Sequence, residues 1–164
     1  MTRELYVAVV GPSAAAPAEH ALGEEVGRLI AEKGAVLVCG GLGGLMEAAA
    51  GGCAAAGGTS IGILPTTDRA VANPYLTVAV ATGMGEARNA IVVRTADAVV
   101  AIGGEFGTLS EIALALKMGK PVIGLDTWEL GKKGGRVDAL VQASTPEDAV
   151  TTALAAAELA RTSS

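Results

Sequence analysis

The chain has 164 residues, of which 51% are hydrophobic and 18% are charged, and its mean hydropathy is +0.48. This composition excludes a disordered chain and predicts a single folded domain over residues 1–164. The formal net charge of −5 argues against nucleic acid or an anionic membrane surface as a partner, because both bind proteins through an excess of Lys and Arg.

Two cysteines and one histidine restrict the chemistry that the chain can perform. Cys39 and Cys53 lie in apolar or Ala-rich runs, which indicates buried thiols of a protein kept in a reducing compartment. His20 falls in a helix-like stretch and is predicted to lie on its surface. With so few soft ligands we expect no metal site, and we predict a cytoplasmic protein with no membrane-spanning segment.

Apolar runs of strand length alternate with longer helical stretches, and glycines lie at the junctions between them. Such alternation predicts a Rossmann-like, doubly wound α/β domain, with a mainly parallel sheet and helices on both faces. The order of the strands stays open. Strands are predicted at residues 5–10, 35–39, 60–64, 77–80, 97–102 and 121–125, helices at 18–33, 45–56, 86–95, 108–118 and from Thr145 onward, and loops at 65–74 and 126–135.

Two glycine turns follow predicted strands, at residues 40–44 and 103–107. In open α/β sheets, ligands bind beyond the carboxyl ends of the strands, where free N–H groups at helix starts attract anions. Glycine lets the backbone approach a phosphate closely, although tight turns between strand and helix also need glycine for steric reasons alone. Two such turns at one sheet edge favour a small phosphorylated ligand.

The familiar nucleotide signatures are missing. Both Gly-Lys pairs, which end at Lys120 and Lys132, are followed by Pro121 and Lys133 instead of Ser or Thr, so the chain has no Walker P-loop. No turn matches GxGxxG, and no GxSxG nucleophile elbow occurs. Ordinary binding of NAD or FAD is therefore not expected.

Two runs, residues 40–65 and 73–125, resemble the LOG-like superfamily, most specifically in GGEFGTLSE at residues 103–111, which is similar to the pattern PGGxGTxxE. The superfamily includes phosphoribohydrolases that activate cytokinins and carrier proteins for the molybdenum cofactor. The length of the chain and its segment NPYLTVAVATG, residues 73–83, resemble the carriers more than the hydrolases.

The resemblance implies a catalytic pair, Arg88 and Glu111, at the 23-residue spacing of the hydrolases. Two positions depart from the hydrolase pattern: Ile102 stands for its proline and Asn89 for its lysine. A carboxylate such as that of Glu111 can stabilise the positive charge that develops on ribose when an N-glycosidic bond breaks. Candidate ligand- and phosphate-binding residues are Gly11, Ser13, Gly40, Gly41, Gly43, Gly44, Met84, Asn89, Gly103, Gly104, Gly107 and Thr108.

Glu111 also has a purely structural interpretation, because Thr108 and Glu111 have the spacing of a helix capping box. Two functions therefore stay open. The first is hydrolysis of a nucleoside 5′-monophosphate to free base and ribose 5-phosphate; the second is a non-catalytic carrier or sensor of an AMP-like nucleotide or molybdopterin. Neither function requires a further cofactor, and the resemblance implies a homodimer or a higher homo-oligomer.

Overall fold

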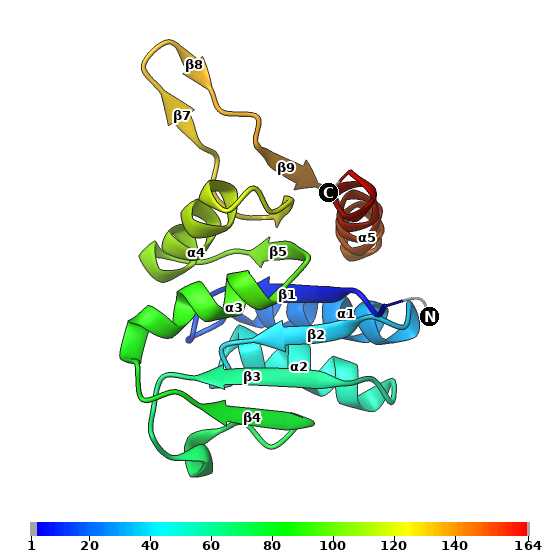
Figure 1. Cartoon of the computed structure of the whole chain (residues 1–164), viewed down its shortest axis with the longest axis vertical. Helices are drawn as coiled ribbons and strands as arrows, with labels where there is room; N and C mark the ends of the chain where they lie inside the picture. The colour runs from blue at the N-terminus through cyan, green and yellow to red at the C-terminus, as the bar shows by residue number, and fades with distance from the viewer. Residues whose placement is uncertain (1–2, 164) are drawn as a thin grey trace.

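The computed structural model describes residues 3–163 and has a seven-stranded sheet in the order β4-β3-β2-β1-β5-β6-β9, with every neighbouring pair parallel (Figure 1). The predicted Rossmann-like, doubly wound α/β fold is confirmed. The strands of this sheet are β1 (Tyr6–Val10), β2 (Val36–Cys39), β3 (Ser60–Leu64), β4 (Val78–Ala81), β5 (Ala98–Ile102), β6 (Val122–Leu125) and β9 (Leu140–Ala143).

Helices cover both faces of the sheet, and Figure 1 shows α3 in front of the strands with α1 and α2 behind them. One buried cluster packs α1, α2 and α5 against one face, and a second packs α3 and α4 against the other. Successive residues of β1 alternate between the two clusters, as the pleat of a doubly covered strand requires. The helices are α1 (Pro17–Glu32), α2 (Leu45–Ala55), α3 (Asn89–Thr95), α4 (Phe106–Lys117) and α5 (Pro146–Thr162), with short 3₁₀ helices η1 (Arg69–Val71) and η2 (Gly85–Arg88).

The two halves of the sheet diverge between β1 and β5, which are direct neighbours although 87 residues separate the end of one from the start of the other. From β1 the chain winds outward through β2 and β3 to β4, then returns to β5 and winds the opposite way. At this switch point the loops after β1 and β5 part, which leaves a crevice at the carboxyl ends of the strands. The topology therefore fixes where a ligand site can form.

Helices α1 and α2 pack unusually closely, through glycines on both. A Cβ atom added to Gly27 would lie 1.9 Å from the Ala49 carbonyl oxygen, and one added to Gly52 would lie 1.9 Å from that of Glu24. Backbone is thus packed against backbone. This contact explains why the chain can use so many small residues and still fill its interior.

The observed elements differ from the predicted ones in several places. The predicted helix at 86–95 is split into η2 and α3, and the predicted loop at 126–135 contains part of a small hairpin, β7 (Gly131–Lys132) and β8 (Gly135–Arg136). Strand β9 was not predicted. Only its first residue, Leu140, is buried, and its identity as a strand comes from pairing with β6.

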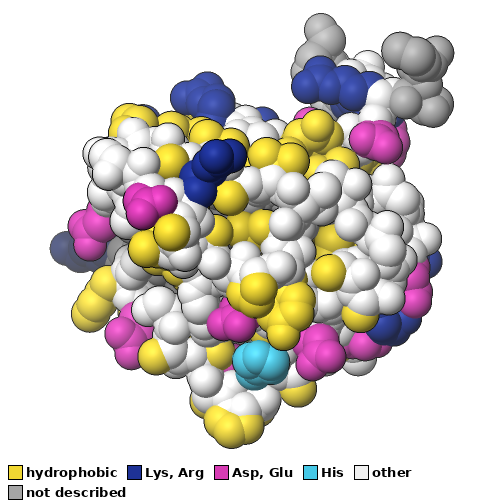
Figure 2. Space-filling model, turned by 90° about the horizontal axis from the view of Figure 1, so that it is seen from below, with side chains coloured by type: hydrophobic (Ala, Val, Ile, Leu, Met, Phe, Trp, Pro, Cys, Tyr) yellow, Lys and Arg dark blue, Asp and Glu magenta, His cyan; other side chains and the backbone are white. Residues whose placement is uncertain are grey.

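Strand β4 ends the sheet and carries exposed apolar side chains. Figure 2, viewed from this edge, shows hydrophobic side chains in several groups among polar and charged ones. Exposed apolar side chains can take part in contacts between proteins, and the oligomeric state stays a prediction. The exposed apolar residues are Val71, Tyr75, Val78, Val80 and Met84, which are 41–50% exposed.

Within residues 3–163, no helix combines the length and hydrophobicity needed to cross a membrane.

Candidate functional site

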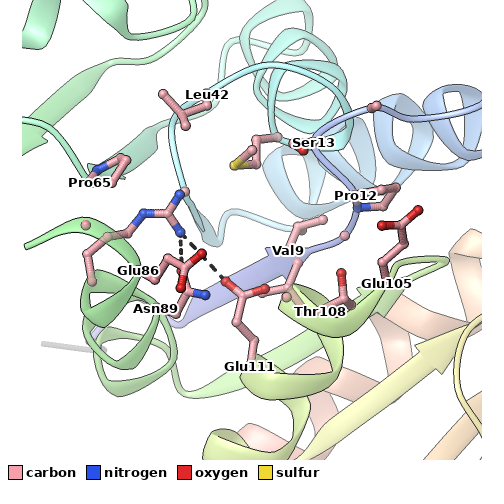
Figure 3. A pocket seen from close by; sticks show the side chains of 18 residues that line it. Val9, Pro12, Ser13, Leu42, Pro65, Glu86, Asn89, Glu105, Thr108 and Glu111 are labelled. Atoms are coloured by element: carbon pink, nitrogen blue, oxygen red, sulfur yellow. Dashed lines mark hydrogen bonds and ion pairs between the residues drawn. The ribbon is translucent and has the colours of Figure 1, made fainter.

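A cavity of about 410 Å³ opens at the switch point, bordered by the segments that follow β1, β2 and β5 and by η2 with the start of α3 (Figure 3). Its volume is in the range of small-molecule sites. Of the residues predicted from the sequence, the structure brings together around this cavity Gly11, Ser13, Gly40, Arg88, Asn89, Gly107, Thr108 and Glu111. The predicted residues that do not line it are Gly41, Gly43, Gly44, Met84, Gly103 and Gly104.

Several glycines outside the cavity wall have steric roles. Gly44 has φ +64°, and a Cβ there would lie 2.3 Å from the Ser13 carbonyl oxygen, so the start of α2 packs directly on the loop after β1. Gly104 has φ +98°, and a Cβ there would lie 2.3 Å from the Thr108 Oγ1. These glycines allow the tight turns of the loops that border the cavity, and neighbouring residues line the cavity itself.

Helix α4 begins two residues earlier than predicted. The chain turns at Gly103 and Gly104, both with positive φ, so Glu105 becomes the extended N-cap residue and Phe106 the first helical one. Thr108 is therefore not the N-cap, and the capping box with Glu111 is wrong. Among the described residues no side chain caps this end, so its N–H groups, including those of the cavity residues Gly107 and Thr108, are open to an anion.

The turn before α4 departs from the pattern of the resemblance. Glu105 and Phe106 lie between Gly104 and Gly107, where the pattern PGGxGTxxE has one residue after its two glycines. Aligned without a gap on the Gly-Thr that follows, the proline of the pattern falls on Gly103 rather than on Ile102, and its second glycine falls on Glu105. This substitution places a carboxylate on the cavity wall.

Arg88 and Glu111 face each other inside the cavity. Arg88 is 8% exposed, Glu111 is 7% exposed, and Arg88 Nη1 lies 3.9 Å from Glu111 Oε1. The guanidinium also donates a hydrogen bond to Asn89 Oδ1 and packs on Gly40, where a Cβ would lie 2.8 Å from Nη2. Within residues 3–163, Arg88 Nε is buried without a hydrogen-bond partner. A buried, unpaired donor is costly, so a hydrogen-bond acceptor that entered the cavity would be favoured here.

Burial shifts the pKa of both Arg88 and Glu111. Removal from water lowers the pKa of Arg88, against the opposing effect of the Glu111 carboxylate. Burial raises the pKa of Glu111 to about 7, and the Arg88 charge only partly offsets this shift. Glu111 can therefore gain or lose a proton near neutral pH, which suits a group that exchanges protons with a ligand.

The Glu111 shift predicts a pH-dependent stability. Its pKa rises from 4.5 to about 7 on folding, so the folded chain binds this proton more tightly, and the resulting stabilisation is complete below pH 4.5 and lost as the pH rises through 7. We expect the free energy of unfolding to fall by up to about 3 kcal/mol across this interval. Urea denaturation at several pH values measures it, with Glu111→Gln as the control. A Gln variant with the same pH profile as the wild type would contradict the assignment.

Sequence reasoning missed several residues on the cavity wall. Glu86 and Glu105 are exposed carboxylates that line it, and neither makes a hydrogen bond or ion pair with another residue of the described range 3–163. Glu86 could have been found from its place two residues before Arg88. Met46 was predicted to be a core residue, and it is 7% exposed and also borders the cavity.

The two cysteines are both buried and free, as predicted. Cys39 ends β2 directly before Gly40, and burial raises the pKa of its thiol to about 11, so the thiol stays protonated beneath the cavity. Within residues 3–163, no group of three or more His, Cys, Asp or Glu side chains has an arrangement that could hold a metal ion.

Comparison with known proteins points to one family. A protein of Archaeoglobus fulgidus without an assigned function is 41% identical over 146 residues, which cover 89% of this chain and 92% of that protein. The molybdenum cofactor binding protein of the phototrophic bacterium Rippkaea orientalis has a structure with TM-score 0.85 and 36% identity, over 94% of this chain and 98% of its own. The molybdenum cofactor carrier protein of Chlamydomonas reinhardtii gives TM-score 0.82 and 30% identity, over 93% and 98%. The SLOG cluster4 family matches residues 4–151, and the chain belongs to this family, within the LOG-like group that its motifs resemble.

Proposed function

We propose that this chain binds a small phosphorylated heterocyclic ligand, a nucleotide or a molybdopterin-type cofactor, and carries it without converting it. The proposal rests on Arg88, a buried arginine on the cavity wall whose Nε has no hydrogen-bond partner in the described part of the chain. A guanidinium fork matches the geometry of a phosphate, and binding one would satisfy the unpaired donor.

The phosphate has a second set of donors across the cavity. The uncapped N-terminus of α4 presents N–H groups at Gly107 and Thr108, and the helix dipole favours negative charge there. The Thr108 side chain is 3% exposed and borders the same space. An anion held between this helix end and Arg88 would be contacted from both halves of the sheet.

The similarity to two molybdenum cofactor proteins supports carriage over catalysis, since both cover more than nine-tenths of this chain at 30% identity or above. The dithiolene-bearing pterin phosphate of such a cofactor offers the same anion as a nucleotide. Its heterocycle would lie against the remaining wall, which includes Leu42 and Met46.

Calorimetric titration of the purified chain tests this function, with nucleoside 5′-monophosphates and with molybdenum cofactor as ligands. We expect one ligand to bind per chain with no free base released, as resolved by chromatography. Failure of every phosphorylated ligand to bind would contradict the proposal.

Hydrolysis of a nucleoside 5′-monophosphate is the second candidate, because Glu111 is buried beside Arg88 with a pKa near 7. In this reaction the bond between ribose C1′ and the base nitrogen breaks, a water oxygen bonds to C1′, and the base leaves with a proton. Glu111 would stabilise the ribose cation and orient the water. Release of base by the wild type and not by Glu111→Gln, with both proteins folded, would move the assignment from carriage to hydrolysis.

A further inference from the structure

One wall of the cavity carries a hydrogen-bond acceptor and a donor side by side. Glu86 lies in η2 and Asn89 begins α3, three residues apart in one continuous helical stretch, so both side chains lie on the same side of it. Figure 3 shows them together on the η2 side, with Glu105 on the opposite side near Pro12 and Thr108. All of these residues line the cavity.

The charges on the cavity wall do not match a phosphate alone. Three carboxylates line it, those of Glu86, Glu105 and Glu111, against the single guanidinium of Arg88. Since Glu86 has no partner among the described residues, its carboxylate is free to accept hydrogen bonds from a ligand. A ligand with an anion at one end and N–H donors at the other would match both kinds of group on this wall.

The orientation of the Asn89 amide follows from Arg88. Because Arg88 Nη1 donates to Asn89 Oδ1, the carbonyl side of the amide is occupied and its NH₂ group is directed elsewhere. Asn89 Nδ2 makes no hydrogen bond within residues 3–163. The wall thus offers, in order, a carboxylate that accepts and an amide that donates.

We infer that Glu86 and Asn89 recognise a 2-amino-4-oxopyrimidine edge, which guanine and pterins share. The Glu86 carboxylate accepts from the ring N–H and the 2-amino group, and Asn89 Nδ2 donates to the oxo group. An adenine edge presents a ring nitrogen lone pair to the carboxylate and an amino group to the amide, so both contacts would be repulsive. This inference rests on the proposed binding of a phosphorylated heterocycle in the same cavity.

The departure at Asn89 has a physical meaning in this assignment. The hydrolase pattern has a lysine there, whose point charge suits an anion, whereas the amide provides a directional donor. Asn89 also holds the Arg88 guanidinium, so one residue links the two ends of the ligand site.

Competition among GMP, IMP and AMP tests the assignment, because IMP differs from GMP only by the absent 2-amino group. We expect the wild type to bind GMP about 10- to 100-fold more tightly than IMP or AMP. Glu86→Gln should reduce this preference to within about threefold, since a neutral amide replaces the carboxylate. Glu129→Gln, which alters an exposed carboxylate outside the cavity lining, is the matched control and should keep the preference.

The possible results separate this inference from the proposed function. Equal binding of GMP and IMP by the wild type, or a preference that survives Glu86→Gln, would overturn the recognition of the 2-amino-4-oxo edge while leaving phosphate binding intact. Absence of binding by all three nucleotides and by a phosphorylated pterin would overturn both. Displacement of bound GMP by the phosphorylated pterin at a lower concentration than by added GMP would identify pterin as the more tightly bound source of the shared edge.

Discussion

Replacement of Arg88 by Met is expected to weaken binding of a phosphorylated ligand by about two orders of magnitude, because it removes the one guanidinium on the cavity wall. Met keeps much of the buried apolar stem, so the loss reports mainly on charge and hydrogen bonds. The same change leaves Glu111 without its cationic neighbour, and its pKa should rise further above 7. Titration calorimetry with the best ligand of the wild type measures the first effect.

Arg94→Met is the matched control for this experiment. Arg94 lies on α3, as Asn89 does, but it is exposed and does not line the cavity. Its substitution should leave the affinity unchanged within about threefold. Equal loss in the two variants would point to general electrostatic attraction, and full affinity in Arg88→Met would remove Arg88 from the site.

The second large effect is on stability, and it is expected where the backbones of α1 and α2 pack against each other. We expect Gly52→Ala to lower the free energy of unfolding by about 2–3 kcal/mol, because its Cβ would lie 1.9 Å from the Glu24 carbonyl oxygen and α1 and α2 would have to separate. At the neighbouring Gly51, the atom nearest to an added Cβ would be Tyr75 Cδ2, at 3.6 Å. Gly51→Ala should therefore stabilise the protein by about 0.5–1 kcal/mol, through helix propensity.

Chemical denaturation of the two variants and the wild type measures this contrast. The substitutions are chemically identical and adjacent in α2, so an effect on the unfolded chain should be nearly the same for both. Opposite signs of the two changes would support the backbone contact between α1 and α2. Similar changes in stability would show that the helices can move apart at little cost.

Much of the site could be located from the sequence because glycine turns and apolar strands are local signals. The turns at 40–44 and 103–107 follow strands that were predicted within one or two residues, and parallel strands place such turns at one edge. The role of each glycine within these turns could not be predicted. Gly40 packs under Arg88, whereas Gly44 supports the loop at Ser13, and only the distances between segments separate the two roles.

The start of α4 shows how a local pattern can mislead. Thr108 and Glu111 have capping-box spacing, but two left-handed glycines before them let the helix begin at Phe106. The residue types alone do not reveal which N–H groups are left free. That choice depends on the backbone turn at Gly103 and Gly104, and it makes the helix end available to an anion.

By itself, the sequence determined the doubly wound α/β class and the sheet edge that carries the cavity, since apolar periodicity and glycine turns are properties of the chain, and its resemblance to a known family indicated the pair Arg88 and Glu111. The tertiary structure alone decided the strand order, strand β9 and the wall formed by Glu86 and Asn89 opposite Glu105. These features depend on contacts between segments distant in sequence. A half-exposed strand such as β9 is stabilised by its neighbour β6, and a carboxylate acquires its role from the groups that surround it in space.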